Sequence, residues 1–373
     1  MKKLKVIIVL FFAVLMVSGC SCSQTMCSEE DNVAIKEAIK EKWNNNEEYK
    51  ATLREEAITK NINDEKEIQK YIDQNIQNKI DSEYKSHPKA CITMNDMEDP
   101  SSGAIIKGKT WKDAFKQGLL EGLIVYPISW LLVSFTNLFG SSGFAKVLAI
   151  VVTTIIIRLL MLAITFKSQV QTQKMQYIQA EITEISNKLK DPNITQAEKN
   201  RLSMKVMEIY KKNGINPLAS LLPTIISLPI FLSVWSAVSQ TLVIRTGEVL
   251  GLTLGQAVST QVFNLNITAI LLFLFMTGSQ ILSMKIPNII RLKQASYKDK
   301  EKIKEANKQT SLMMNIMLIM ILITGFLLPS ALAIYWTVGA IFSIVQTIIF
   351  QSPKVKEKLY NLGNRKKKAK VVR

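Results

Sequence analysis

Five long apolar stretches dominate the hydropathy pattern of the chain. They contain almost no charge and cover residues 147–166, 217–238, 264–284, 311–328 and 330–350. Each is about 18–22 residues long, which matches a hydrocarbon core of about 30 Å at a helical rise of about 1.5 Å per residue. The pattern predicts a polytopic all-α membrane protein, because the spans of a β-barrel would be shorter and would alternate.

The N-terminus has the pattern of a targeting segment. Basic "MKKLK" precedes the apolar run "VIIVLFFAVLMV", which is too short for a full span and ends in "VSGC". Small residues before a cysteine are typical of a bacterial lipoprotein signal. We expect residues 1–19 to be removed and Cys20 to carry a lipid such as palmitate on the outer face. The alternatives are an ordinary signal peptide or an uncleaved anchor.

A polar, exported segment follows. Residues 28–115 hold 19 acidic and 14 basic side chains. The stretches "AIKEAIKEKW" and "EIQKYIDQNIQNKIDSEY" place apolar residues at spacings of three and four, which predicts a small helical extracellular domain. Cys22, Cys27 and Cys91 lie in it, and a disulfide is possible without the sequence naming the pair. His87, beside Pro88, is predicted to be a solvated loop residue.

The positions of basic residues decide which way the spans cross. Loop 167–216 has 9 basic and 5 acidic residues, loop 285–310 has 8 and 3, and tail 351–373 has 9 and 1. Segment 240–263 contains only Arg245 and Glu248. Cytoplasmic loops carry the Lys and Arg excess, so five spans after an exported domain place every basic segment inside.

Residues 111–140 would invert this topology if they also crossed the membrane. We therefore interpret them as an outer-face interfacial helix, kinked near Pro127. The predicted organisation is a signal peptide over 1–19, an extracellular helical domain over 20–110, the interfacial helix over 111–142, spans over 143–166, 217–239, 264–284, 311–328 and 330–350, a cytoplasmic hairpin over 167–216, an extracellular loop over 240–263, a cytoplasmic loop over 285–310 and a basic tail over 351–373.

Loop 167–216 has the pattern of two antiparallel helices. Its first half carries an apolar stripe at helical spacing, formed by Met175, Ile178, Ile182, Ile185 and Leu189. The proline of "DPN" breaks this helix. A capping box from Thr195 to Glu198 starts the second, which stops at Gly214. The alternative is an ordinary charged loop, which the stripe disfavours.

Arg158 lies in the middle of the first span. An arginine costs about 2.5–3.5 kcal/mol at a span centre on insertion scales, and it cannot lose its proton. It should therefore face a polar cavity inside the bundle. None of the five apolar stretches contains an acidic residue, so its partner is expected to be a substrate carboxylate. The alternative is an arginine held by backbone carbonyls and glutamines, with a packing role only.

The net charge of +17 with 48% hydrophobic residues suits a membrane protein with basic cytoplasmic segments. The sequence contains no Gly-rich phosphate loop, no zinc motif and no nucleophile–base pair, so we expect neither an enzyme nor a cofactor.

Four stretches of the chain carry a resemblance to a known family. They are "GFAKVLAIVVTTIIIRLLMLAITFKSQ", "EIYKKNGINPLASLLPTIISLPIFLSVW", "FMTGSQILSMKIPN" and "LPSALAIYWTVGAIFSIVQTIIF". Together they resemble the YidC/Oxa1 membrane protein insertases, in the lipoprotein form of Gram-positive bacteria. The resemblance covers roughly residues 119–350. It implies five helices around a hydrophilic groove that is open to the cytoplasm and to lipid. Groove positions match Arg158, Thr154, Gln280 and Trp336, and contacts to the substrate helix match Leu228, Phe231 and the pair Tyr335–Trp336.

The resemblance also implies a function. The protein is expected to be an insertase and chaperone for nascent membrane proteins, to reside in the bacterial plasma membrane and to act as a monomer, alone or with the Sec translocon. The basic tail would contact the ribosome or anionic lipid. One alternative is an anion or small-solute transporter with Arg158 as its site, although no internal repeat supports it. Another is a scaffold lipoprotein whose exported domain binds envelope partners. A separate alternative for Phe231 and Trp336 is that they are lipid-facing or packing aromatics.

The predicted topology is testable at the cytoplasmic hairpin. A cysteine that replaces Lys190 should react with a membrane-impermeant thiol reagent only after the cells are permeabilised. Labelling of intact cells at this position would contradict the topology.

Overall fold

The structure, a computed structural model, describes residues 26–189, 191, 193–216, 222–294, 297–352 and 355. The predicted signal peptide, the lipid site Cys20, Cys22 and the tail beyond residue 355 lie outside the described residues. The chain divides into two compact units, one of residues 1–149 and 232–256 and one of residues 150–231 and 257–373. Helices α7 (Gly143–Lys188) and α9 (Leu222–Gln240) contribute residues to both units.

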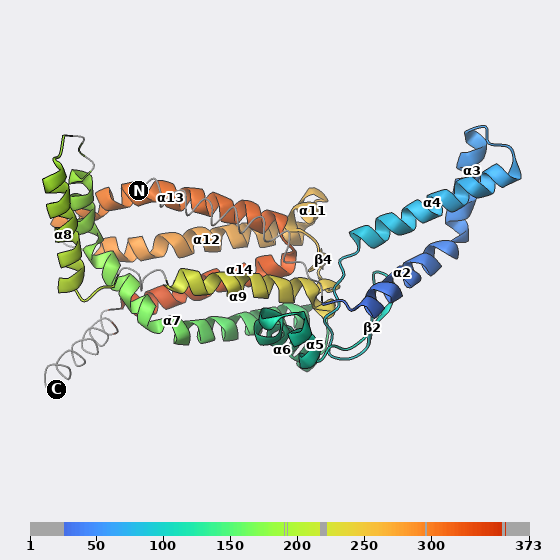
Figure 1. Ribbon diagram of the computed structural model, residues 1–373, viewed down its shortest axis with the longest axis horizontal. Helices are drawn as coiled ribbons and strands as arrows, with labels where there is room; N and C mark the ends of the chain where they lie inside the picture. The colour runs from blue at the N-terminus through green and yellow to red at the C-terminus, as the bar shows by residue number, and fades with distance from the viewer. Residues whose placement is uncertain are drawn as a thin grey trace. The chain divides into compact units, whose positions relative to one another are not determined.

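The first unit begins with three helices, α2 (Glu29–Asn44), α3 (Glu47–Thr59) and α4 (Glu65–Ser86) (Figure 1). Each starts at a side-chain cap, from Ser28, Asn46 and Asp64 respectively, which satisfies a backbone N–H that the helix leaves unpaired. The buried apolar residues of these helices are Ile35, Ile39, Leu53, Ala57, Ile68, Ile72, Ile76 and Ile80. The predicted helical periodicity of the exported segment is confirmed.

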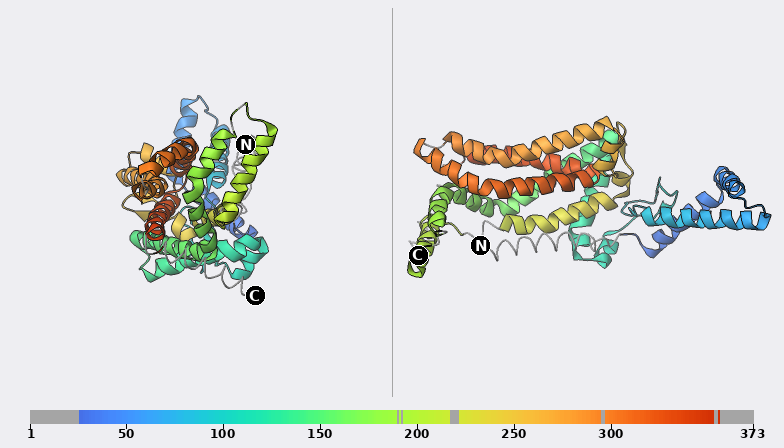
Figure 2. Two further views of the ribbon diagram at one scale, coloured as in Figure 1. Left: turned by 90° about the vertical axis from the view of Figure 1, so that its left-hand side faces the viewer. Right: turned by 90° about the horizontal axis from the view of Figure 1, so that it is seen from above.

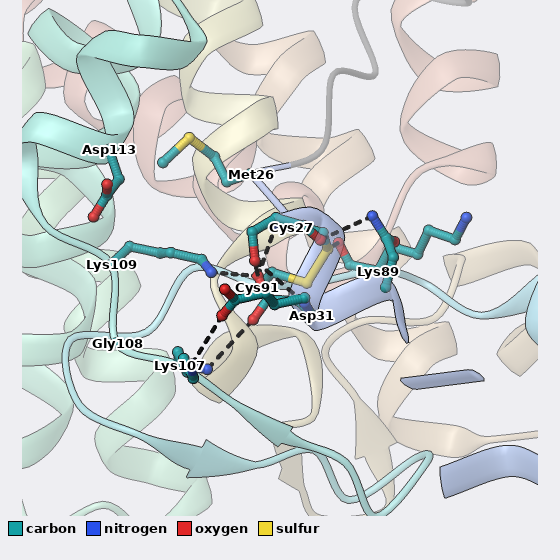
Figure 3. A network of polar contacts seen from close by, with 12 residues as sticks. Met26, Cys27, Asp31, Lys89, Cys91, Lys107, Gly108, Lys109 and Asp113 are labelled. Carbon is teal, nitrogen blue, oxygen red and sulfur yellow. Dashed lines mark hydrogen bonds and ion pairs between the residues drawn. A yellow bond between two sulfur atoms is a disulfide. The ribbon is translucent and has the colours of Figure 1, made fainter. Parts of the chain in front are cut away.

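A disulfide and a buried ion pair hold the start of α2 (Figure 3). Cys27 is bonded to Cys91, which resolves the pairing that the sequence left open. Asp31, which is 1% exposed, accepts hydrogen bonds from the N–H and hydroxyl of Ser28 and pairs with the ammonium of Lys109. A buried carboxylate needs such partners, because an unpaired charge away from water is very unfavourable.

His87 is buried, so the prediction of a solvated loop residue was wrong. Its Nδ1 accepts the N–H of Lys89 at 3.1 Å, and its Nε2 lies 2.7 Å from Oδ2 of Asp99. Nε2 therefore carries the proton and donates it to the carboxylate. Ser101 also contacts Nε2, at 2.8 Å. Because that nitrogen is already protonated, it cannot take a proton from the serine, and the cluster is structural and not a hydrolytic triad.

Residues 92–106 form one short hairpin and one isolated backbone bridge, and the bridge reaches the end of α9. Strand β1 (Met97–Glu98) pairs antiparallel with β2 (Ile105–Ile106). Ile92 forms a parallel bridge with Thr241, in which its N–H donates to the carbonyl of Gln240 at 2.8 Å. The N–H of Met26 donates to the side chain of Gln240 at 2.7 Å. These bonds lie within the first unit and fix both ends of the disulfide-closed segment.

The segment predicted as an interfacial helix consists of three pieces. Helix α5 (Trp111–Gln117) ends at Gly118, the π-helical turn η1 (Glu121–Val125) follows, and α6 (Tyr126–Leu138) has Pro127 in its first turn. One side buries Val125, Leu132 and Val133. Large apolar side chains remain exposed on the segment, and these are Trp111, Phe115, Leu119, Leu120, Leu123, Trp130, Leu138 and Phe139. The backbone stays helical through Val125 and Tyr126, and the break in the segment lies at Gly118, so the kink near Pro127 stays a prediction.

The loop after α9 is folded and not extended. It contains the single turn α10 (Leu242–Arg245), the hairpin strands β3 (Glu248–Val249) and β4 (Leu252–Thr253), and the short helix α11 (Val258–Phe263). Within the first unit, α10 packs against α6. Leu242, Ile244 and Leu254 are fully buried, and this apolar core explains why so short a segment is ordered.

The predicted cytoplasmic hairpin is present, with one difference. Helix α7 continues without a break from the apolar stretch to Lys188, so the boundary expected at residue 166 is not a structural one. Helix α8 (Gln196–Lys212) starts at Thr195, whose hydroxyl accepts the N–H of Glu198. The predicted stripe on α7 packs against Leu202, Ile209 and Ile215.

The remaining helices of the second unit run side by side, as Figures 1 and 2 both show. They are α12 (Ile267–Gln294), α13 (Tyr297–Leu327) and α14 (Ser330–Gln351). Helix α12 packs mainly on α14. Their common core includes Met276, Phe273, Ala333 and Trp336.

Among the described residues, four helices are long and apolar enough to cross a membrane: 121–138, 143–172, 267–294 and 330–351. Two shorter apolar helices cover Ile226–Gln240 and Met314–Leu327. The predicted spans after residue 143 all fall on these helices. Length and composition do not distinguish a span from an interfacial helix for 121–138, so the count of five stays a prediction.

The Asp99 cluster predicts a pH dependence of the exported segment. Burial raises the pKa of Asp99, but hydrogen bonds from His87, Ser101 and Ser102 outweigh it and lower the pKa from 3.8 to about 2. Such a group stabilises the folded state above its unfolded pKa, and this stabilisation, about 2 kcal/mol, is lost as the pH falls from about 4 to 2.

Asp99→Asn should therefore speed amide hydrogen exchange in residues 87–104 of the full-length protein at pH 7, and should flatten its change between pH 4 and 2. Asp81→Asn, at an exposed carboxylate on α4, is the matched control. Equal exchange in the two variants would contradict the assignment.

Candidate functional site

The guanidinium of Arg158 lies against helix α14. The Cζ atom is 5.8 Å from the ring centroid of Tyr335, a cation–π distance. One helical turn further along α14 is Gly339, and a Cβ atom built there would lie only 2.8 Å from Cζ and 3.0 Å from Nε of Arg158. Any other residue at position 339 would have to displace the charge. Tyr335 and Gly339 are four residues apart, so both present the same face of α14.

Arg158 has an incomplete set of partners among the described residues. No described acidic side chain forms an ion pair with it, and its Nε atom is buried without a hydrogen-bond partner among the described residues. The hydroxyls of Thr153 and Thr277 are also buried and unsatisfied there. A buried polar atom without a partner is costly, and such atoms in proteins usually bond to water or to a ligand.

A second group of predicted residues meets around Trp336. The ring of Phe231 lies 5.7 Å from the ring of Trp336, with an angle of 33° between their planes. The amide of Gln280 donates to the carbonyl of Trp336 at 3.4 Å, a long hydrogen bond. Leu228, one turn before Phe231 on α9, is half-buried. The structure thus brings Phe231 and Gln280 together at Trp336, and their predicted roles toward a substrate stay predictions.

Thr154 is placed differently from the other predicted residues. It lies one turn before Arg158 on α7, but it is only 1% exposed and its hydroxyl donates to the carbonyl of Ile150 at 2.6 Å. Its hydroxyl proton therefore serves the helix backbone, and only its lone pairs remain for other contacts.

Two glycines complete the site and were missed by the sequence reasoning. Gly339 makes room for Arg158. Gly325, on α13, makes room for Met276 and Trp336, because a Cβ there would lie 2.6 Å from Cε of Met276. A signal was available for Gly339, since a glycine inside an otherwise strong helical run costs about 1 kcal/mol and usually has a packing reason.

The chemistry available at this site is non-covalent. Among the described residues no group of three or more His, Cys, Asp and Glu side chains could hold a metal ion. What the site offers is a fixed positive charge at the middle of an apolar helix, beside an aromatic ring and a bare glycine backbone.

The contact between Arg158 and Gly339 predicts a measurable coupling. Gly→Ala inside a helix normally stabilises it by about 0.5–1 kcal/mol. Gly278→Ala on α12 should do so, because a Cβ there meets nothing within 4 Å. Gly339→Ala should not, because its methyl group displaces Arg158. In an Arg158→Ala background the benefit of Gly339→Ala should return, as thermal unfolding in detergent would measure. Additive effects of the two changes would contradict the contact.

Comparisons with known proteins identify the family of the chain. Residues 137–358, which contain the Arg158 site, match the family described as "60Kd inner membrane protein". "Membrane protein insertase YidC 2" of Bacillus anthracis is 34% identical over 243 residues, which are 64% of this chain and 84% of that protein. "Membrane protein insertase YidC" of Oceanobacillus iheyensis is 33% identical over 247 residues, which are 65% of this chain and 87% of that protein.

The resemblance noted from four stretches of sequence is therefore confirmed over more than half of the chain. The exported helices α2–α4 lie before the matched residues. The family match and the sequence identity to these two relatives show that the chain belongs to the 60Kd inner membrane protein family of YidC membrane protein insertases.

Proposed function

We propose that this protein is a non-enzymatic insertase that moves nascent membrane proteins from the cytoplasm into the bacterial membrane and assists their folding. The observation that carries the proposal is the unneutralised guanidinium of Arg158, held at the middle of an apolar helix against Tyr335 and Gly339. Membership of a family whose relatives are called membrane protein insertases supports it.

Arg158 attracts the polar or acidic outer segment of a substrate. An acidic side chain that enters this region gains the attraction of a charge with no fixed counter-ion among the described residues, in surroundings less polar than water. The attraction lowers the cost of moving a polar segment part of the way across the membrane. Thr154 lies on α7 with Arg158, and Gln280 lies on α12 with Thr277. Both contribute further polar atoms.

The apolar helix of the substrate then moves into lipid along α9 and α14. Leu228, Phe231 and Trp336 provide partly exposed apolar and aromatic surface for that contact. Tyr335, the other residue predicted to contact the substrate helix, is only 6% exposed, and its ring lies against Arg158 instead. Pro229 lies inside α9, where it removes one backbone hydrogen bond. The freed carbonyl is tolerated in a membrane where it faces a polar cavity.

The orientation that this function requires follows the distribution of basic residues. Helices α7, α9, α12, α13 and α14 span the membrane, helix α6 and its neighbours lie in the outer interface, and the α7–α8 hairpin and the basic tail are cytoplasmic. The exported helices stand outside, with Cys20 as a lipid anchor. Basic cytoplasmic segments suit the ribosome as a partner, and the Sec translocon is a second proposed partner.

The test varies the charge at Arg158 and in the outer segment of a substrate. Arg158→Ala should reduce membrane insertion of a single-span substrate with an acidic outer segment about tenfold, which corresponds to about 1.4 kcal/mol. Arg158→Lys should keep most of the activity if charge alone matters, and should lose it if the planar guanidinium is needed. Protease protection of the substrate in inverted membrane vesicles measures insertion.

The same substrate with its acidic residues replaced by amides is the matched control. It should depend much less on Arg158. Equal loss for both substrates would show that Arg158 serves structure and not attraction. If none of the variants loses insertion, and if the protein carries solutes across liposome membranes, an anion transporter is favoured instead.

A further inference from the structure

Leu250 occupies a position that a leucine does not normally take. Strands β3 and β4 pair Glu248 with Thr253 and Val249 with Leu252, so the hairpin loop is the dipeptide Leu250–Gly251. Both residues have positive φ, +50° and +74°. A two-residue loop with two left-handed residues is a type I′ turn, which favours Asn-Gly because a leucine side chain is strained there.

The side chain of Leu250 is also exposed, unlike its apolar neighbours. It is 70% exposed, whereas Val249, Leu252 and Leu254 are at most 8% exposed. An asparagine would adopt the left-handed conformation of the turn with less strain, and its side chain would be better solvated. A strained backbone together with an exposed apolar side chain at the same residue points to a functional reason.

The base of the hairpin lies at the outer end of the first span. A Cβ atom built on Gly143, the first residue of α7, would lie 3.0 Å from the carbonyl carbon of Glu248. One built on Gly247 would lie 2.8 Å from Cδ of Lys146. Lys146 is the last charge before the apolar stretch 147–166. The hairpin therefore starts at the depth where the span leaves the hydrocarbon core.

The surroundings of the hairpin are those of a membrane interface. The tip is only two residues from Glu248, which is about 7 Å of extended chain. Helix α10, which leads into the hairpin, packs on α6, whose segment exposes Trp130 and other large apolar side chains. Lys146 and Arg245 flank the hairpin, and neither forms an ion pair with a described acidic residue. Cations at this depth suit lipid phosphates.

We propose that the 248–253 hairpin is an interfacial membrane anchor, whose tip residue Leu250 inserts at the boundary between headgroups and acyl chains of the outer leaflet. The burial of the leucine in lipid offsets the strain of its backbone. The anchor holds the loop between α9 and α12 at a fixed depth. The proposed anchor depends on α7 crossing the membrane and not on the proposed insertase function, so each proposal can be disproved without the other.

The test places an environment-sensitive fluorescent amino acid at position 250 of the full-length protein in liposomes that contain no other protein. Lipids with a spin label near the headgroup should quench it several-fold more than the same probe at Gln256, an exposed residue of the same loop. Position 148, on an exposed leucine within α7, is the positive control and should be quenched best by a spin label deep in the acyl chain.

Quenching at 250 no greater than at 256 would overturn the proposal. So would a probe that is quenched little in liposomes but shielded in native membranes, because a protein partner would then cover the tip.

A small substitution guards against disturbance of the turn by the probe. Leu250→Cys should react several-fold more slowly with an impermeant maleimide than Gln256→Cys in the same liposomes, as mass spectrometry of the hairpin peptide would measure. Equal rates in the two variants would overturn the proposal independently of the fluorescence.

Discussion

The permanent charge of Arg158 is the constraint to which the rest of the helical unit is adapted. A guanidinium cannot be neutralised by losing its proton, so its surroundings must accommodate it. Helix α14 does so with the aromatic face of Tyr335 and the absent side chain of Gly339. No described carboxylate completes the neutralisation, and Nε is left without an acceptor among the described residues. A buried polar atom without a partner costs stability, and the proposed function gives this cost a reason.

In residues 26–110, by contrast, the buried carboxylates have several hydrogen-bond donors each. Asp31 receives Ser28 and Lys109, and Asp99 receives His87 and two serines, so each carboxylate has several donors. Together with the Cys27–Cys91 bridge, these contacts secure the segment where it joins the rest of the first unit. The contrast separates two uses of buried charge: satisfied networks that specify one structure, and an unsatisfied cation suited to binding.

Much of the local structure was predictable, because periodicity and capping act over a few residues. The isoleucine spacing of α4 and the Thr195 cap of α8 follow from rules of neighbouring residues. The family resemblance singled out Phe231, Gln280 and Trp336, and the structure shows that the first two contact the third. The predictions failed or stayed open where the partner is distant in the chain. His87 resembled a loop residue because Asp99 lies 12 positions away, and Cys27 had two candidate partners.

The sequence alone determined that this is a membrane protein with a charge in an apolar helix, because hydropathy and the number of charges are properties of the chain and need no coordinates. It also determined that no apolar stretch offers that charge an acidic partner. Only the tertiary structure decided what the charge touches. The approach of Arg158 to Gly339 joins residues far apart in sequence, and a glycine contributes no side chain from which a pattern could reveal it. The exposed leucine in a left-handed turn was likewise hidden, because φ and solvent exposure exist only in the folded chain.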